Sequence, residues 1–300
     1  MDQQTPTRGV CMFAYNNEQI DYIKLAILAA KHVKKHLNLP VCLITDSGTD
    51  SWMSQSVDPK TVDECFDYIV IEDVQFRRNI RVHHDSPWTE FNAQFNNSNK
   101  HKIFQYTPFQ QTILIDTDYM IKSDFLSHVF ECDGFSGVSM FDRALTIRNE
   151  LPALAERQLY DAGVKMWWST VVCFDKSPIA KLFFDTWAHV ADNYEYYRYL
   201  YAFPGHMFRT DYCVSIAAHI LNGMRDGDVV GNFGDTAMYY VDQKDDIYHI
   251  DSHQNWILFS VDPQERWKNI LVNHRNIDLH VMNKRALLRH FARIKDLLDE

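Results

Sequence analysis

Apolar strands alternate with an amphipathic helix at the start of the chain, and this alternation constrains the fold more than any other feature. An apolar run at 9–15 (GVCMFAY) precedes a segment at 18–37 whose apolar residues recur at helical spacing. Two further apolar runs follow at 41–45 (VCLIT) and 66–71 (FDYIVI). Strand, helix and strand in this order form a parallel pair with the helix across one face. We therefore expect an α/β fold with an open, mostly parallel sheet, which binds ligands at the carboxyl ends of its strands.

The rest of the chain continues this pattern without a visible linker or internal repeat. The long polar stretch 77–99 predicts a mobile loop or an insertion poor in helix, and loops of this length tend to be functional. Further strands are expected at 112–116, 135–140 and 167–174 and near Met238, Ile247 and Ile270, and helices at 100–106, 125–131, 178–193, 211–221 and 284–298, with helical character at 143–165. A single domain over residues 1–300 is the interpretation that fits best.

Composition and charge narrow the classes of function. The net charge of −10 argues against a protein that binds nucleic acid through its overall field. The six cysteines contain no C-x-x-C pair and mostly have apolar neighbours, which predicts reduced, buried thiols. The polar N-terminus has no signal-peptide pattern, and no apolar run reaches the roughly 18 residues of a membrane span. We expect a cytoplasmic protein with no membrane contact.

Two aspartates, Asp116 and Asp118, follow the apolar strand that ends at Ile115. In an extended backbone, residues i and i+2 point to the same side, so both carboxylates would face one volume at the edge of the sheet. Hard oxygen donors suit Mg²⁺ or Mn²⁺, and a cation there can bridge a diphosphate and stabilise its departure. A strand that simply ends in acidic turn residues is the common alternative, so this motif needs support from its surroundings.

Those surroundings resemble the central block of the GT-A glycosyltransferases, especially the family that includes glycogenin and the bacterial galactosyltransferases. The resemblance rests on residues 102–109 (KIFQYTPF) and 112–118 (TILIDTD). It implies a GT-A (Rossmann-like) fold with a mixed α/β C-terminal portion. It also implies metal-dependent, retaining transfer of a hexose or pentose from a nucleoside diphosphate sugar, a UDP sugar in particular, to a hydroxyl. By this similarity Lys102 contacts the donor, and Asp116, Thr117 and Asp118 hold the metal and the diphosphate.

The N-terminal block fits the same family. Ala14, Tyr15 and Asn16 match the nucleoside-binding start, where Tyr15 would lie against the base and the backbone near Ala14 would recognise its edge. The alternative for Tyr15 is a core tyrosine at a strand end. By the same resemblance, residues 1–140 form the nucleotide-sugar-binding half, and 141–300 form the acceptor side with the C-terminal helix.

The C-terminal block completes the implied metal site. A late histidine, His280, would join the two aspartates as a ligand of Mn²⁺ or Mg²⁺, and Lys284 would bind the diphosphate. His274 is the competing histidine. Asp211 stands where the family holds the sugar hydroxyls or sits beneath the anomeric carbon, and a helix N-cap is its alternative role. Residues 168–171 (WSTV) depart from the family pattern, which changes the sugar and acceptor pocket.

The acceptor is left open by the sequence. Arg77, Arg78 and Arg81 among aromatics, and the aromatic segment 194–203, suit phosphates and stacked bases, although aromatics more often fill cores or stack on sugars. Residues 208–223 are similar to glycosyltransferase-like proteins of large phages, some of which modify hydroxymethylated pyrimidines. DNA is therefore an alternative acceptor, reached in the host cytoplasm by extruding a base.

Two other classes of protein compete with a glycosyltransferase. A nucleotidyltransferase would show a glycine-rich phosphate loop after the first strand, and residues 16–18 (NNE) contain no glycine. A non-catalytic nucleotide-sugar-binding protein would keep the fold and lose turnover. The Asp116, Asp118 and His280 set argues against that second alternative.

Overall fold

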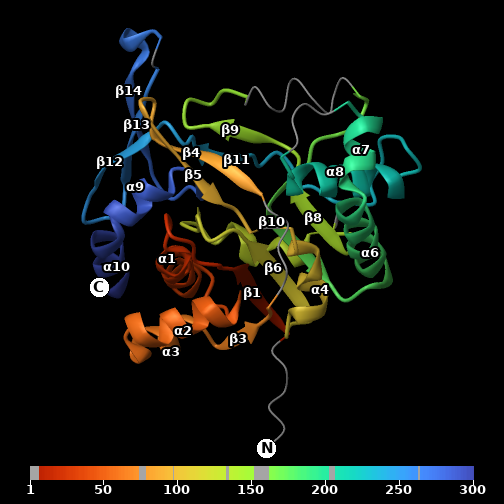
Figure 1. Ribbon diagram of the computed structural model, residues 1–300, viewed down its shortest axis with the longest axis horizontal. Coiled ribbons are helices and arrows are strands. Elements are labelled where there is room, and N and C mark those ends of the chain that lie inside the picture. The colour runs from red at the N-terminus through yellow and green to blue at the C-terminus, as the bar shows by residue number, and fades with distance from the viewer. Residues whose placement is uncertain are drawn as a thin grey trace, which may run out of the picture.

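A six-stranded sheet forms the centre of the molecule (Figure 1). The computed structural model describes residues 7–73, 79–96, 98–132, 135–151, 162–202, 207–262 and 264–300. The strand order is β3-β2-β1-β6-β10-β8, with bounds β1 (Arg8–Phe13), β2 (Val41–Thr45), β3 (Tyr68–Ile71), β6 (Gln111–Ile115), β8 (Val138–Phe141) and β10 (Trp168–Asp175). The first four are mutually parallel, and β10 runs antiparallel to both of its neighbours. The expected open, mostly parallel sheet is confirmed.

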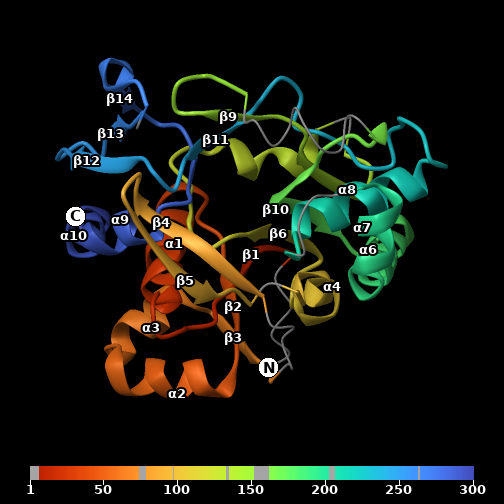
Figure 2. The same cartoon turned by 45° about the horizontal axis from the view of Figure 1, so that its top comes forward.

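Helices cover this sheet with their apolar faces, and two of them have a clear start signal. In α1 (Tyr22–His36), the Asp21 side chain accepts a hydrogen bond from the Lys24 amide, and ten residues of the helix are buried. The helix α6 (Pro178–Asp192) begins with Ser177 as its cap and a proline in its first turn. In the views of Figures 1 and 2, α1 lies on one side of the central sheet, and α6 and α8 (Thr210–Leu221) lie beside β8 and β10 on the other.

A second sheet lies next to the first and is joined to it by the aspartate segment. Its order is β7-β15-β11-β9, with bounds β7 (Tyr119–Met120), β9 (Ala144–Thr146), β11 (Met238–Val241) and β15 (Leu279–Val281). Residues 116–118 connect β6 of the first sheet to β7 of the second. The C-terminal strand β15 pairs antiparallel with β7. The chain therefore brings a late segment against the end of β6.

The C-terminal region adds an antiparallel sheet and two helices. The strands are β12 (Asp246–Ile250), β13 (Trp256–Ser260) and β14 (Ile270–His274), and the connection between β13 and β14 projects from the body in Figure 1. The helix predicted at 284–298 is divided at His290 into α9 (Lys284–Arg289) and α10 (Phe291–Asp299). Both helices pack against α1.

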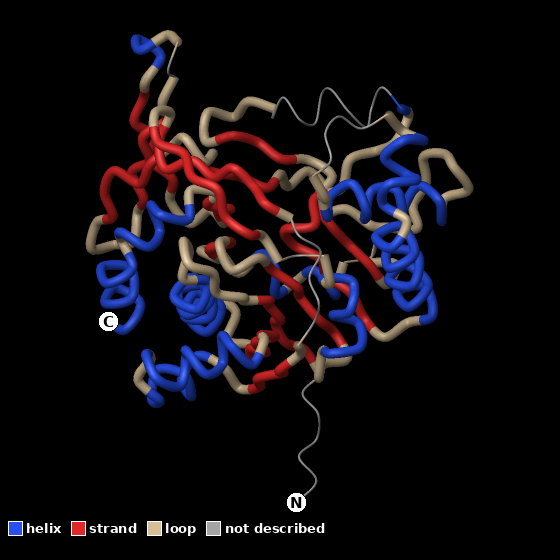
Figure 3. Tube along the Cα trace, in the orientation of Figure 1, coloured by secondary structure: helices blue, strands red, loops and turns tan. Residues whose placement is uncertain are grey.

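The polar stretch predicted as a loop contains an antiparallel hairpin, β4 (Ile80–Ser86) and β5 (Thr89–Gln94). Of the two alternatives predicted for this stretch, the insertion poor in helix agrees with the hairpin, and the mobile loop is wrong for these residues. The reason is that only His83 and Ala93 are buried in the two strands, while Ile80 and Val82 are exposed, so the apolar alternation is weak. Figure 3 distinguishes the helices, strands and loops of the described residues by colour.

Short helices account for most of the other differences from the sequence prediction. The helices α2 (Ser47–Ser56) and α3 (Pro59–Cys65) bury few residues and lack a strong periodic signal. Predicted helical segments appear as 3₁₀ turns η1 (Lys100–Lys102), η2 (Phe125–Ser127) and η3 (Val129–Glu131), followed in one case by α4 (Ile103–Tyr106), and the aromatic segment forms α7 (Tyr194–Leu200). Of the segment 143–165, residues 144–146 form β9 and 152–161 lie outside the described residues.

The remaining expectations concern cysteines and membranes. All six cysteines are free, and Cys132 is exposed while the other five are buried. Among the described residues, the helices are all too short or too polar to cross a bilayer.

Candidate metal and donor site

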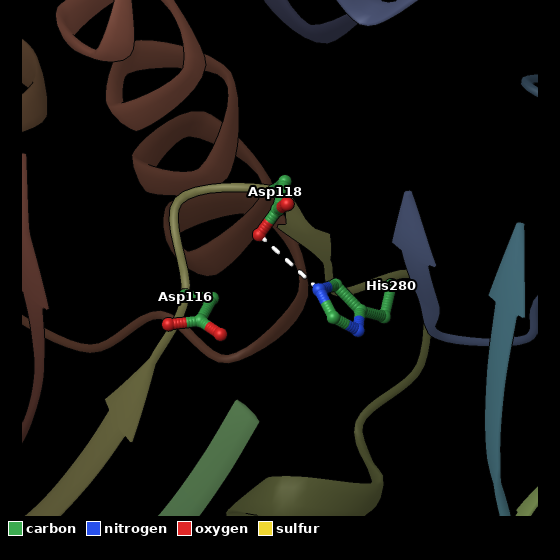
Figure 4. A group of neighbouring side chains, drawn as sticks. All are labelled: Asp116, Asp118 and His280. Atoms are coloured by element: carbon green, nitrogen blue, oxygen red, sulfur yellow. Dashed lines mark ion pairs between the residues drawn. The ribbon is translucent and has the colours of Figure 1, made fainter. Parts of the chain in front are cut away.

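Asp116, Asp118 and His280 lie together at the end of β6 (Figure 4). One potential ligand atom from each residue lies within 4.8 Å of the other two. Nε2 of His280 is 3.4 Å from Oδ1 of Asp118. Strand β15 positions the imidazole, because His280 pairs directly with Tyr119 of β7.

Backbone hydrogen bonds fix the segment that carries the aspartates. The Asp116 amide donates to the Thr170 carbonyl at 3.0 Å, and the Val281 amide donates to the Asp118 carbonyl at 2.8 Å. The Tyr119 amide donates back to the Asp116 carbonyl at 3.0 Å, so the chain turns at 116–119. The two carboxylates therefore meet through a turn between two sheets, and the extended geometry expected from the sequence is not the cause.

Two lysines neutralise the carboxylates. Nζ of Lys284 lies 2.5 Å from Oδ2 of Asp118, and Lys100 forms an ion pair with Asp116. Burial alone would raise the pKa of Asp118, but the charges of Lys284 and His280 outweigh it and hold that pKa far below its usual range. Two carboxylates and an imidazole are a donor set that fits Mn²⁺ or Mg²⁺.

The lysine beside the aspartates is Lys100, whereas the sequence pointed to Lys102. Nζ of Lys102 lies 2.9 Å from Glu72, and Lys102 is not among the residues that line the cavity described below. Residues two apart on a helical turn do not face the same way, and both lysines lie on η1. Lys100 also donates to the Ser169 carbonyl at 3.2 Å. The structure places Lys100 beside Asp116, and the donor contact of Lys102 stays a prediction.

A cavity of 390 Å³ opens at this cluster. Seven of the ten residues predicted for the metal and donor site line it: Tyr15, Asp116, Thr117, Asp118, Asp211, His280 and Lys284. Besides Lys102, two do not: Ala14 is fully buried, with its carbonyl accepting from the Thr45 hydroxyl, and Asn16 accepts from the Ile23 amide at 3.0 Å. The competing histidine, His274, is buried elsewhere, near the Ile147 carbonyl.

Tyr15 and Asp211 line this cavity and are each fixed by a neighbouring side chain. The Tyr15 hydroxyl accepts a hydrogen bond from Asn99 at 2.8 Å. Oδ1 of Asp211 accepts from the amide and the hydroxyl of Ser169 at 3.0 and 2.7 Å. Burial would raise the pKa of Asp211, but Arg209 and these hydrogen bonds lower it. The N-cap position of α8 belongs to Arg209, so Asp211 is not a helix cap.

Several wall residues come from segments that the sequence did not tie to the site. The hairpin contributes Arg81 and His83, and Arg209 precedes α8. Burial and the charges of Lys284 and Arg81 lower the pKa of His83 to about 4. Arg81 belonged to the arginine group expected to meet an acceptor, while its companions Arg77 and Arg78 lie outside the described residues. Nothing local in the sequence connects Arg209 with a hairpin more than a hundred residues earlier.

Comparison with family models and with curated proteins finds no match. Among solved structures, the chain is similar to the galactosyltransferase LgtC in complex with donor and acceptor sugar analogues, with 12% identity and a TM-score of 0.51. That alignment covers 97% of this chain and 95% of LgtC. The glycosyltransferase GlyE of Streptococcus pneumoniae TIGR4 is 13% identical with a TM-score of 0.42, and the alignment covers 76% of this chain but only 46% of GlyE, less than half its length. Mouse xyloside xylosyltransferase 1 is 12% identical with a TM-score of 0.43, over 74% of this chain and 85% of that one.

The fold is an open α/β sheet, and the site places two carboxylates and an imidazole beyond the end of a parallel strand. The likeness to LgtC extends over nearly the whole length of both chains. The chain therefore has the GT-A fold.

Proposed function

We propose that this protein is a metal-dependent glycosyltransferase that moves a hexose or pentose from a nucleoside diphosphate sugar to an acceptor hydroxyl. The observation that carries the proposal is the Asp116, Asp118 and His280 cluster, within 4.8 Å, in a cavity that also receives Lys100 and Lys284. The GT-A fold supports the same function.

The donor diphosphate is the group that this charge arrangement suits. Asp116, Asp118 and His280 hold the cation, Mn²⁺ or Mg²⁺, which neutralises charge on the departing nucleoside diphosphate when bound. Lys100 and Lys284 pair with the aspartates and line the same cavity, where they would contact the phosphate oxygens of a bound donor. Thr117 lies between the two ligands and lines the same wall.

In this proposal, the nucleoside and the sugar of the donor contact different residues of the cavity. Tyr15 packs against the base, which we propose is uracil, and Ala14 and Asn16 shape the backbone that holds it. Asp211, fixed by Ser169, would accept hydrogen bonds from the sugar hydroxyls. We propose retention at the anomeric carbon, because the family resemblance implies it, and a front-face reaction of this kind needs no dedicated base from the protein.

Release of nucleoside diphosphate from a panel of nucleotide sugars tests the proposal, with Mn²⁺ or with EDTA. We expect metal-dependent release from at least one donor. Asp118→Asn should abolish it, since the carboxylate that faces His280 loses its charge, while the exposed control Asp124→Asn keeps the wild-type rate. Absence of metal-dependent release from every donor would refute the transferase and leave a non-catalytic binding protein.

The acceptor is found by a separate experiment. Mass spectrometry of DNA, glycans and proteins from cells that make the enzyme, compared with cells making Asp118→Asn, reveals the glycosylated product. Sugar on hydroxymethylated pyrimidines would identify DNA as the acceptor, and sugar on a glycan or protein would exclude it.

A further inference from the structure

Lys100 and Lys284 contact the same two carboxylates that would bind the metal ion. Nζ of Lys284 lies 2.5 Å from Oδ2 of Asp118, and Lys100 forms an ion pair with Asp116. These contacts are largely shielded from water, since the side chains of Lys100, Lys284 and Asp118 are 7%, 11% and 4% exposed. Each ligand carboxylate therefore already faces a positive charge of the protein.

Both ammonium groups have donors left for a further partner. Within the described ranges, the only hydrogen bond of the Lys284 ammonium goes to Asp118, and Lys100 adds to its ion pair a hydrogen bond to the Ser169 carbonyl at 3.2 Å. An ammonium has three donors on a flexible stem, and both side chains line the cavity. A phosphate oxygen in the cavity can therefore become a partner of either lysine.

The charged side chains of the cavity wall balance one another. Four are cationic and four are carboxylates: Arg81, Lys100, Arg209 and Lys284 against Asp116, Asp118, Asp211 and Asp242. A divalent ion that binds alone adds two positive charges to this balanced wall, and a donor diphosphate that binds alone adds two negative charges. Only the two together keep the balance. Because unbalanced charge is costly where water is excluded, the ion and the diphosphate favour each other's binding.

The two lysines carry more of this effect than the arginines of the wall, because they lie directly on the ligand carboxylates. Arg209 pairs with Asp211 instead, at 3.5 Å, and Arg81 donates to the Phe208 carbonyl at 2.9 Å. Without its lysine, a ligand carboxylate keeps its full negative charge and attracts a divalent ion more strongly. The lysines therefore weaken the binding of a metal ion that arrives without a diphosphate.

We propose that Lys100 and Lys284 make metal binding conditional on the nucleotide: the site binds Mn²⁺ tightly only together with a nucleoside diphosphate, whose phosphate oxygens become partners of the two lysines. This inference rests on the proposed function, since it concerns the metal ion and the donor of that same site. The coupling is reciprocal, so the nucleotide without metal is also bound weakly.

Electron paramagnetic resonance measures the affinity of the wild type for Mn²⁺ alone and with saturating UDP, after allowance for the complex of Mn²⁺ with UDP in solution. We expect UDP to strengthen Mn²⁺ binding by about 100-fold, and Mn²⁺ to strengthen UDP binding in calorimetry by the same factor. Mn²⁺ that binds equally tightly with and without UDP would overturn the inference.

Lysine variants separate this effect from direct coordination of the metal by the phosphates, which every variant retains. Lys284→Met should bind Mn²⁺ alone about 10-fold or more tightly than the wild type, and the strengthening by UDP should shrink by at least the same factor. Lys100→Met should act in the same direction. Lys284→Arg keeps the charge and should leave the affinity for Mn²⁺ alone near that of the wild type.

Lys165→Met is the matched control, because Lys165 also forms an ion pair with a carboxylate, at 2.9 Å from Asp142, but does not line the cavity. It should match the wild type in both measurements. Affinity for Mn²⁺ alone that is unchanged or weaker in both Lys284→Met and Lys100→Met would contradict the assignment.

Melting curves show whether each variant is folded. If neither methionine variant folds, Lys284→Gln decides the question, since it removes the charge and keeps a hydrogen-bond donor for Asp118. The two proposals fail differently. If Mn²⁺ does not bind the wild type even with UDP, both are refuted. If Mn²⁺ binds with UDP but the lysine variants bind Mn²⁺ alone no more tightly than the wild type, only the conditional binding is refuted.

Discussion

Lys100 and Lys102 are two residues apart but contact different parts of the molecule, and this pair tests the donor site at the scale of one side chain. Lys100 pairs with Asp116 inside the cavity, whereas Lys102 pairs with Glu72 outside it. We expect Lys100→Met to lower kcat/KM for donor hydrolysis by about 10-fold or more, the size of a lost charge-assisted contact. Lys102→Met should remain within about twofold of the wild type.

Steady-state kinetics at saturating Mn²⁺ measures both variants. Their melting temperatures serve as the control, since Lys100 is buried and its loss leaves Asp116 without its partner. The reverse order of activities would place the donor contact at Lys102, as the family resemblance suggested.

Asp245, in the connection between β11 and β12, predicts a pH dependence of stability. Burial, and then the nearby charge of Asp242, raise the pKa of Asp245 from 3.8 to about 6. The folded state therefore holds a proton that the unfolded state has lost between these values, so the free energy of unfolding falls as the pH rises through this window. Two pKa units correspond to about 2–3 kcal/mol.

Denaturant unfolding at a series of pH values measures this effect as the difference between wild type and Asp245→Asn, which cancels the other titrating groups. We expect the stability of the wild type relative to the variant to decrease from about pH 4 to about pH 6 and then level off. A difference that does not change with pH would show that Asp245 has an ordinary pKa.

At the scale of elements, the β4–β5 hairpin is held against the C-terminal helix α9. Asn283, fully buried, caps that helix by accepting from the Ala286 amide at 3.0 Å. Its side-chain amide donates to the Asp245 carbonyl at 2.8 Å and to the Asp85 carbonyl of the hairpin at 3.3 Å. Arg289 adds an ion pair to Asp85. The hairpin that carries Arg81 therefore depends on a segment two hundred residues later.

Asn283→Ala should lower the free energy of unfolding by about 2–4 kcal/mol, because it removes a helix cap and leaves buried carbonyl groups without donors. Equilibrium unfolding in urea measures it. The control Asn92→Ala, on the exposed side of the same hairpin, should change stability by less than about 0.5 kcal/mol. Equal stability of the two variants would contradict the structural role of Asn283.

At the scale of the whole molecule, the site is assembled where two sheets meet, and this explains how much of it the sequence predicts. The parallel strands and the aspartates after β6 are local sequence patterns, which the spacing and the type of the residues identify. The position of His280 beside the aspartates depends on the pairing of β15 with β7. No local sequence pattern predicts this pairing, so only the family resemblance pointed to His280.

The residues that were misplaced or missed have a physical reason in common. The choice between Lys100 and Lys102 depends on the phase of one 3₁₀ turn, and boundaries of short elements are the weakest part of any sequence prediction. The hairpin buries so few residues that its alternation is faint. Arg209 joins Arg81 only after α8 and the hairpin pack around Asp211, which is a property of the complete fold.

Direct measurement of Mn²⁺ binding tests the central claim, which is that Asp116, Asp118 and His280 form the cation site of a donor pocket. Electron paramagnetic resonance in the presence of UDP gives the affinity of the wild type, of His280→Ala and of His274→Ala. We expect His280→Ala to weaken Mn²⁺ binding by about 10-fold or more and His274→Ala to leave it unchanged, since His274 lies near Ile147 and away from the aspartates. Wild-type affinity in His280→Ala, or its loss in a folded His274→Ala, would contradict the site.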